Sequence, residues 1–229
     1  DPHYAARREK LLLIAVNCTH PAATCFCDAT GDGPLVSGGC DLLLDELDDG
    51  FVVSAGSERG EALAGALPLL DLDAEHQQAL EQGRSRAGNA QVRHLPAGDL
   101  PRILFDHLEH PAWAEIAERC LSCGNCTAVC PTCFCHSTEE ATELDGRTSR
   151  RRRLWDSCFT EGHSYIHGIT LRAETPLRYR QWLTHKFGGW EEQYGRSGCV
   201  GCGRCITWCP AGIDVTESLR LVAGEPAHV

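Results

Sequence analysis

Two runs of cysteines stand out in this chain because both repeat one spacing, C-x-x-C-x-x-C-x-x-x-C-P. The first run contains Cys120, Cys123, Cys126 and Cys130, and the second contains Cys199, Cys202, Cys205 and Cys209. Cysteines at this spacing bind [4Fe–4S] clusters, because thiolate sulfur is a soft anionic ligand that suits iron–sulfur chemistry. Two copies in one chain therefore predict two clusters and a role in carrying electrons.

The fourth cysteine of each run lies one residue further on and is expected to bind the cluster of the other run. One predicted cluster is bound by Cys120, Cys123, Cys126 and Cys209, and the other by Cys199, Cys202, Cys205 and Cys130. Glycines inside the runs let the backbone bend around the inorganic core and direct N–H groups at its sulfurs. These glycines are Gly124, Gly201 and Gly203.

Zinc is the main alternative to iron–sulfur clusters, since paired C-x-x-C motifs also make four-ligand zinc sites. A zinc site would leave the third cysteine and the C-P of each run without a role, so we favour iron–sulfur clusters. Disulfides are typical of small chains in oxidising compartments. This chain has 229 residues and does not start with a charged-then-apolar leader. We therefore expect reduced cysteines and a cytoplasmic location.

Seven cysteines lie outside the two runs: Cys18, Cys25, Cys27, Cys40, Cys133, Cys135 and Cys158. The pattern T-C-F-C occurs twice among them, ending at Cys27 and at Cys135. This repetition predicts a further iron–sulfur or metal site that uses some of Cys18, Cys25, Cys27, Cys133, Cys135 and Cys158. The alternative is buried thiols without a ligand, which are common in protein cores.

Composition restricts the possible partners. The net charge of −11 argues against nucleic acid as a partner. The longest apolar run, Leu11–Val16, is much too short to cross a bilayer, so we expect no membrane span. The chain has no methionine and begins at Asp1. We therefore expect it to be a piece of a longer polypeptide.

The residue pattern predicts an α+β protein whose residues 1–99 form an α/β N-terminal region, a truncated piece of a larger domain. Buried strands are expected at Leu11–Val16 and Phe51–Val53. Gly83–Gly98 is expected to be a loop or linker. Helical spacing is found at Cys40–Leu47, Gly60–Leu70 and Ala74–Gln82, with Gly83 expected to end the last of these.

Residues 100–229 are expected to form a bacterial-type dicluster ferredoxin-like domain. A helix at Ala112–Arg119 should deliver Cys120 to its cluster. A long helical insert, residues 132–198, separates the two cysteine runs.

Helix punctuation is clear at two places in this region. In the insert, Thr175 is the expected N-cap of a helix with Pro176 in its first turn, and Gly188 lies just beyond the expected end. A final helix is expected from Asp214, with Glu217 completing a capping box, to near Gly224.

The insert also contains aromatic side chains and a run of arginines. Most of the aromatics are expected to be ordinary core, and the alternative is that they cover the clusters or a partner surface. They are Trp155, Phe159, Tyr165, Trp182, Phe187 and Trp190. The arginine run, Arg150–Arg153, is expected to be a solvated face, with docking of carboxylates or a cofactor phosphate as the alternative.

Motifs that would mark a substrate or nucleotide site are missing from the sequence. No G-x-G-x-x-G, Walker A, G-x-S-x-G or C-x-x-C-H motif occurs, and we assign no catalytic residue. The sequence therefore indicates an electron carrier that is one subunit of a larger redox enzyme.

Several segments resemble one protein family: Cys120–Cys135, Trp155–Cys158, Gly198–Cys205, Asp1–Glu9 and Val16–Cys27. They are similar to the dicluster iron–sulfur subunits of sulfhydrogenase (the beta subunit of NADP-linked nickel–iron hydrogenases) and of anaerobic sulfite reductase. The resemblance extends over essentially the whole chain. The T-C-F-C, W-D-S-C and V-N-C elements are its discriminating parts.

The resemblance implies electron transfer through two [4Fe–4S] clusters between two partners, a flavin-containing NAD(P)H-oxidising subunit on one side and a hydrogenase or reductase catalytic subunit on the other. It implies that the eight cysteines of the runs bind these clusters and that a further segment precedes this chain. The other six cysteines recur together in the family, which favours a third Fe–S cluster. The alternatives are the same relay in an anaerobic sulfite reductase, a sulfur- or disulfide-reducing enzyme that uses an additional cluster, and a zinc-stabilised interaction module.

Overall fold

The structure is a computed structural model that describes residues 1–225. It is a mixed α+β chain with small sheets, which confirms the predicted fold class. The chain divides into two compact units, one at Asp1–Val92 and the other from Arg93 onward. Each unit is described by itself below. The domain bounds 1–99 and 100–229 stay a prediction.

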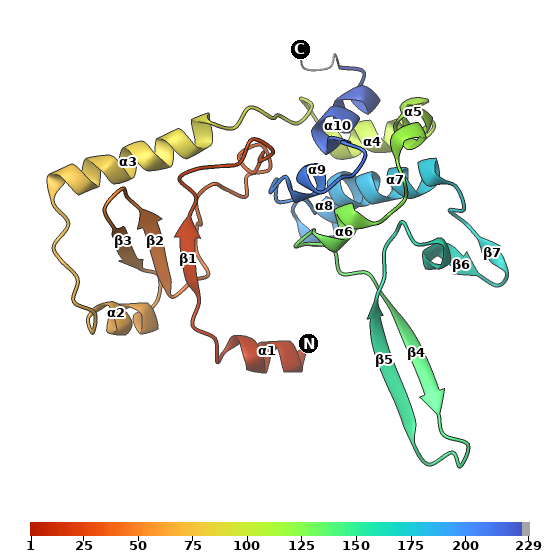
Figure 1. Ribbon diagram of the computed structural model, residues 1–229, viewed down its shortest axis with the longest axis horizontal. Helices are drawn as coiled ribbons and strands as arrows, with labels where there is room; N and C mark the ends of the chain where they lie inside the picture. Colours follow the sequence, from red (N-terminus) through yellow and green to blue (C-terminus); the bar gives the residue numbers. More distant parts are fainter. Residues whose placement is uncertain (226–229) are drawn as a thin grey trace. The chain divides into compact units, whose positions relative to one another are not determined.

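A three-stranded sheet forms the centre of the N-terminal unit (Figure 1). Strand β1 (Ile14–Asn17) is parallel to β2 (Leu42–Glu46), and β2 is antiparallel to β3 (Phe51–Ala55). The strands expected near Leu11–Val16 and Phe51–Val53 are present, but their predicted burial is wrong, because Ile14, Val16 and Phe51 are exposed on these outer strands. The helix expected at Cys40–Leu47 is wrong, because β2 is the central strand and hydrogen-bonds to neighbours on both sides, which outweighs the local helical spacing of its leucines.

The helices of this unit are α1 (Pro2–Arg8), α2 (Glu58–Ala64) and α3 (Ala74–Asn89). Helix α2 is shorter than the predicted Gly60–Leu70. It begins earlier because the Ser57 side chain caps it. Helix α3 runs through Gly83 to Asn89, so the predicted end at this glycine is wrong, and the predicted linker Gly83–Gly98 is confirmed only after Asn89. A glycine within a helix costs only about 1 kcal/mol relative to alanine, and α3 gains buried packing from Leu80 and Ala87.

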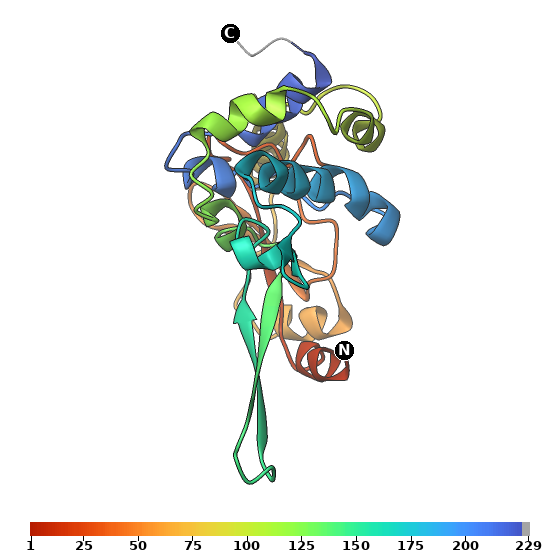
Figure 2. The same cartoon turned by 90° about the vertical axis from the view of Figure 1, so that its right-hand side faces the viewer.

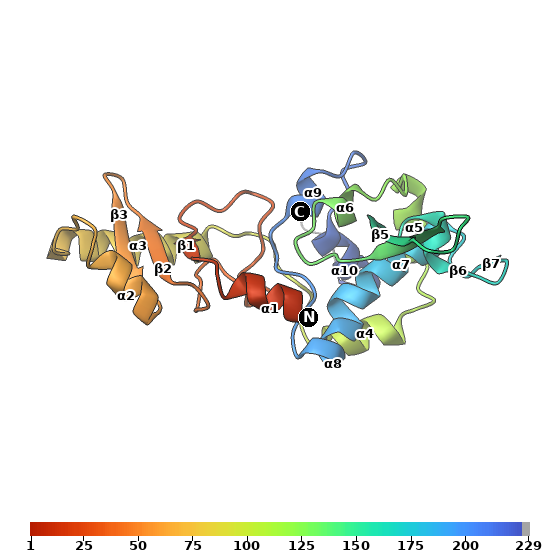
Figure 3. The ribbon, with the colours of Figure 1, turned by 90° about the horizontal axis from the view of Figure 1, so that it is seen from below.

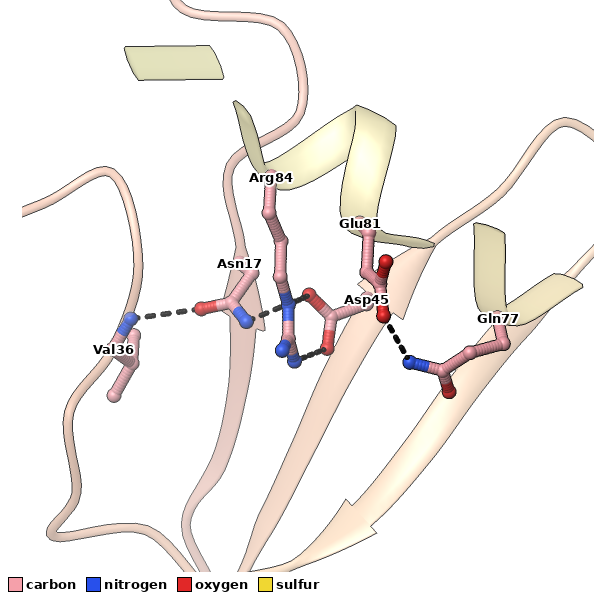
Figure 4. A network of polar contacts seen from close by, with 6 residues as sticks. All are labelled: Asn17, Val36, Asp45, Gln77, Glu81 and Arg84. Atoms are coloured by element: carbon pink, nitrogen blue, oxygen red, sulfur yellow. Dashed lines mark hydrogen bonds and ion pairs between the residues drawn. The ribbon is translucent and has the colours of Figure 1, made fainter. Parts of the chain in front are cut away.

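A buried ion pair attaches α3 to the sheet (Figure 4). Asp45 on β2 is 1% exposed. Arg84 on α3 donates from Nε to Asp45 Oδ1 at 2.9 Å and from Nη2 to Oδ2 at 2.6 Å. Asn17 on β1 donates to the same Oδ1 at 2.7 Å and accepts from the Val36 backbone N–H at 2.8 Å. Burial alone would raise the pKa of Asp45, but the hydrogen bonds from Arg84 and Asn17 hold it below its usual value.

The C-terminal unit is a group of helices with a shared core (Figure 3). Helices α4 (Leu100–Asp106), α5 (Ala112–Arg119), α7 (Thr175–Thr184) and α10 (Val215–Ala223) pack on one another. Helix α5 has the predicted bounds. The predicted start and end of α10 are also confirmed, because the Asp214 side chain accepts from the Thr216 N–H and Gly224 ends the helix in a left-handed conformation; the capping box with Glu217 stays a prediction. Leu104, Ile116, Leu183 and Leu219 are fully buried between these helices.

The helical segment that starts with α7 continues further than predicted, although α7 itself ends at Thr184. Its N-cap is Glu174, with Thr175 as the first helical residue. It continues through a π-helical segment (His185–Gly189) into α8 (Trp190–Tyr194), so the end expected at Gly188 is wrong. A π-helical segment inserts an extra residue into a helix and is often found at functional sites. This segment contains a buried lysine, Lys186.

The predicted insert also contains an extended hairpin. Strands β4 (His136–Thr142) and β5 (Ser149–Trp155) form a long exposed hairpin that extends away from the helices of its unit (Figure 2). A 3-10 turn (Glu161–Ser164) and the short strands β6 (Tyr165–Ile166) and β7 (Ile169–Thr170) follow it. Among residues 1–225, no helix has both the length and the apolar character that a membrane crossing requires.

The Asp45–Arg84 pair gives a test of how the N-terminal unit is held together. Substitution Arg84→Met leaves a buried carboxylate without its cation, and we expect the β2 amides to lose about 3 kcal/mol of protection against hydrogen exchange at pH 7. Substitution of the exposed Arg86→Met on the same helix is the matched control. Because the folded pKa of Asp45 is lowered, the difference should disappear only as the pH falls through that lowered value. Equal protection in the two variants at pH 7 would contradict this role of the ion pair.

Candidate metal centre

The first cysteine run is presented by the end of one helix and the start of another. Cys120 is the extended residue that ends α5. Ser122 and Gly124 then adopt positive φ angles of 50° and 76°, which turn the chain into the short helix α6 (Asn125–Ala128). This turn exposes Cys123 at the surface and places Cys126 on the helix. A left-handed backbone is what glycine allows at low cost, so Gly124 is suited to its position.

The second run repeats this geometry. Gly201 and Gly203 have φ angles of 61° and 68°, and Gly203 precedes the short helix α9 (Arg204–Thr207), which carries Cys205. Helices α6 and α9 contact each other (Figures 1 and 3). The two runs therefore meet in one place with matching local structure, as the repeated spacing predicts.

One cavity contains the four cysteines that the sequence assigns to the first cluster. Cys120, Cys123, Cys126 and Cys209 line it, and Cys205 of the second run also reaches it. The backbone N–H of Ile213 donates to Cys209 Sγ at 3.3 Å. Apolar side chains complete the wall: Leu121, Phe159, Tyr179, Trp182, Pro210, Ala211, Ile213 and Val215.

The cysteines assigned to the second cluster are also close together. Cys199 and Cys205 each interact electrostatically with Cys130 and Cys202. The Gly201 N–H donates to Cys199 Sγ at 3.4 Å. Cys205 lies between the two sets, since it also interacts with Cys126. The assignment of ligands to each cluster stays a prediction.

The cysteine thiols assigned to the two clusters suit polynuclear iron–sulfur clusters. Burial raises the pKa of Cys126 and Cys205, and raises that of Cys199 to about 11. Such thiols ionise at neutral pH when a metal replaces the proton. In the part of the chain that the structure describes, no three His, Cys, Asp or Glu side chains converge on the position of a single ion. The thiols instead surround a space, which fits a cluster better than one tetrahedral zinc with bonds of about 2.3 Å.

Trp182 adds a donor that the sequence analysis did not identify as functional. Its side chain is buried, and its Nε1–H has no hydrogen-bond partner among residues 1–225. Because Trp182 lines the first cavity, its N–H is a candidate donor to an acceptor there. Hydrogen bonds from such groups to cluster sulfurs are one of the means by which proteins set reduction potentials.

Lys186 was missed by the sequence analysis and lies beside the second set. It is 3% exposed. Its Nζ donates to Thr132 Oγ1 at 2.8 Å and to the Gly198 carbonyl at 3.1 Å, and Thr132 Oγ1 is 3.2 Å from Cys130 Sγ. Burial alone would lower the pKa of Lys186, but the thiolates of Cys130 and Cys133 raise it above its ordinary value. The only signal in the sequence is a lysine within a helical pattern rich in aromatic residues.

The aromatic side chains expected to be core fall into different groups, and some of them fit the alternative that they cover the clusters. Phe159 and Trp182 are buried and line the first cavity, and Phe187 is core. Trp155 and Tyr165 are exposed. Tyr179, which the sequence analysis did not single out, also lines the cavity and donates to Ser218 Oγ at 2.9 Å.

The arginine run lies on β5 and is exposed, as the solvated-face interpretation expects. Arg151 and Arg152 form cross-strand ion pairs with Glu140 and Glu139 on β4. Docking of a partner by these arginines stays a prediction.

The cysteines outside the runs fall into two groups. Cys133, Cys135 and Cys158 belong to the C-terminal unit and line one small cavity together. Cys18, Cys25, Cys27 and Cys40 belong to the N-terminal unit. In that unit, the Gln91 amide donates to Cys27 Sγ at 3.3 Å. None of the cysteines in residues 1–225 forms a disulfide.

Comparison with known proteins supports the resemblance predicted from the cysteine motifs. A family described as 4Fe-4S dicluster domain matches residues 119–213. The chain is also similar to Sulfhydrogenase 2 subunit beta of Pyrococcus furiosus, with 32% identity over 224 residues. The similar region covers 96% of this chain and 65% of that protein, so the chain spans just under two thirds of the relative's length. No solved structure matches the chain.

Proposed function

We propose that this chain, a homologue of the sulfhydrogenase beta subunit with a 4Fe-4S dicluster domain in its C-terminal half, relays single electrons through two [4Fe–4S] clusters. The observation that carries the proposal is the meeting of the two cysteine runs. The contacting helices α6 and α9 each present one run, and Cys209 of the second run lines a cavity with three cysteines of the first.

The proposed ligands follow a crossover, in which the fourth cysteine of each run binds the cluster of the other run. Cys120, Cys123, Cys126 and Cys209 would hold one cluster, and Cys199, Cys202, Cys205 and Cys130 the other. Each bound cluster supplies reversible one-electron chemistry without a change of substrate bonds. The chain contributes the thiolates, backbone N–H donors such as those of Gly201 and Ile213, and an apolar wall that excludes water.

The surface beside the cysteines assigned to the first cluster offers a docking place for a redox partner. Leu121 and Trp208 are 68% and 63% exposed, and they are neighbours in sequence of Cys120 and Cys209. Their position next to two predicted cluster ligands, rather than their exposure alone, makes them the candidates for a partner contact. We propose as partners a flavin-containing NAD(P)H-oxidising subunit on one side and a hydrogenase catalytic subunit on the other. The supporting fact is that the relative is named as a subunit of a sulfhydrogenase. We place the complex in the cytoplasm, where reduced cysteines that form no disulfide among residues 1–225 are expected.

The crossover can be tested by double substitution in the full chain, reconstituted anaerobically. Substitution Cys123→Ala should remove about four irons per chain, because one cluster loses a ligand. The double variant Cys123→Ala/Cys209→Ala should lose the same four, since both cysteines serve one cluster. The measurement is iron and acid-labile sulfide per chain, with Cys40→Ala as the control that loses none.

Two results of this test would count against the account. Loss of about eight irons in the double variant would show that each run holds its own cluster. Chains that bind zinc in place of iron would contradict the relay itself.

Lys186 should raise the reduction potential of the cluster that Cys130 and Cys199 hold, because a buried cation favours the extra negative charge of the reduced state. Substitution Lys186→Met keeps the length of the side chain and removes the charge. We expect this potential to fall by about 60 mV, a tenfold change in the ratio of reduced to oxidised cluster. The measurement is a redox titration followed by EPR.

Substitution of the exposed Lys10→Met is the matched control for this titration. Lys10 is the other lysine of the chain, and it lies in the N-terminal unit. The potential of the cluster bound by Cys120 should change less than that of the other. A shift of the same size in both clusters, or none in either, would contradict the local role of Lys186.

A further inference from the structure

Three cysteines of the C-terminal unit are not used by the two-cluster proposal, and they share one cavity. Cys133 and Cys135 come from the T-C-F-C motif, and Cys158 comes from W-D-S-C. The other residues that line this three-cysteine cavity are Thr132, Phe134, Trp182, His185, Lys186 and Trp190. The two discriminating motifs of the insert therefore meet at one place.

The β4–β5 hairpin is the element that brings the two motifs together. His136, which follows Cys135, pairs with Trp155 at the base of the hairpin. The pairing is extended by a bond from the Asp156 N–H to the Cys135 carbonyl at 3.1 Å. This register fixes Cys135 opposite the start of the segment that carries Cys158. Cys135 and Cys158 are far apart in sequence, but the base of the hairpin brings them close together in space.

The same segment is anchored to the first cysteine run. Ser157 lies between Asp156 and Cys158, and its hydroxyl is 2.7 Å from Thr127 Oγ1 on α6. Ser157 also accepts from the Phe159 N–H at 3.1 Å. The position of Cys158 is therefore set from both sides, by the hairpin and by α6. Preorganised ligands of this kind are what a metal site requires.

Lys186 supplies positive charge at the cavity. It is buried, and no carboxylate pairs with it within residues 1–225. Its hydrogen-bond acceptors include the uncharged Thr132 hydroxyl and Gly198 carbonyl, together with the Cys130 sulfur. A buried cation without an anion is costly. Three cysteine sulfurs interact electrostatically with it: those of Cys130 and Cys199, which are assigned to the second cluster, and that of Cys133 in this cavity.

The chemistry of the donors selects the kind of metal centre. Three cysteine sulfurs are soft ligands that favour iron–sulfur clusters or zinc. With His185 on the cavity wall, the set would also suit a Cys₃His zinc site. A single zinc ion needs its donors around one point, however, and no three donors in the described residues converge in that way. A cluster spreads its ligands over several irons, as at the two runs.

We propose that Cys133, Cys135 and Cys158 hold a third iron–sulfur cluster, with His185 beside its fourth coordination position and Lys186 as its buried counter-charge. The proposal rests on the proposed function, since it adds a cluster to the two-cluster relay. Cys133 contacts Cys130 through a thiol hydrogen bond. The third cluster would therefore lie next to the cluster that Cys130 helps to hold. Trp182 lines both this cavity and the first one, and its Nε1–H has no partner in residues 1–225.

The test is the content of iron, acid-labile sulfide and zinc in the full chain after anaerobic reconstitution. The unaltered chain should contain about twelve irons. The double variant Cys135→Ala/Cys158→Ala should contain about eight and keep the EPR spectrum of the two remaining clusters. Cys133 is left unchanged because of its contact with Cys130. The variant Cys18→Ala/Cys40→Ala, which removes two cysteines of the other unit, is the control and should keep all twelve.

The possible results separate this proposal from the relay. About eight irons in the unaltered chain would overturn the third cluster and leave the two-cluster relay standing, whether or not the variant folds. Twelve irons that persist in the Cys135→Ala/Cys158→Ala variant would place the extra cluster elsewhere and also overturn the proposal. One zinc per chain that this variant loses would replace the cluster by a zinc site. Four irons or fewer in the unaltered chain would instead contradict the proposed function.

Discussion

Eight cysteine thiols brought into one small volume impose the constraint on which the rest of the C-terminal unit depends. Burial raises the pKa of the thiols most enclosed, Cys126 and Cys205 among them. Neighbouring thiolates would repel one another if they ionised without a cation. A metal centre resolves this conflict, because it takes the place of the protons and turns repulsion among the ligands into attraction to iron.

The surrounding structure follows from that constraint. The backbone must approach the cluster closely, which explains the left-handed turns at Gly124 and Gly203 ahead of α6 and α9. Water must be kept away, which the buried side chains of Phe159 and Trp182 achieve. Excess negative charge needs a balance, and the buried Lys186 is placed on the π-helical segment to provide it. The N-terminal unit shows the same rule on a smaller scale, since its buried carboxylate, Asp45, is matched by an arginine.

The sequence predicted what is local and missed what is long-range. The bounds of α5 and the Asp214 cap and Gly224 end of α10 are set by neighbours in the chain, and these features were predicted closely. Strand β2 was mistaken for a helix because pairing with two other strands decides its conformation. Helix α3 was ended too early at Gly83 because the contacts that extend it lie on the sheet. Lys186 was missed because the type of a residue does not reveal its burial.

The central claim is that the two runs hold two clusters close enough to interact, and EPR of the full chain reduced with dithionite tests it most directly. Two reduced [4Fe–4S] clusters at the contact of α6 and α9 are predicted to give a broadened, spin-coupled spectrum. On partial reduction this spectrum should simplify toward that of a single paramagnet. The absence of any iron–sulfur signal in reduced, iron-loaded chain, or two independent signals without coupling, would contradict the account.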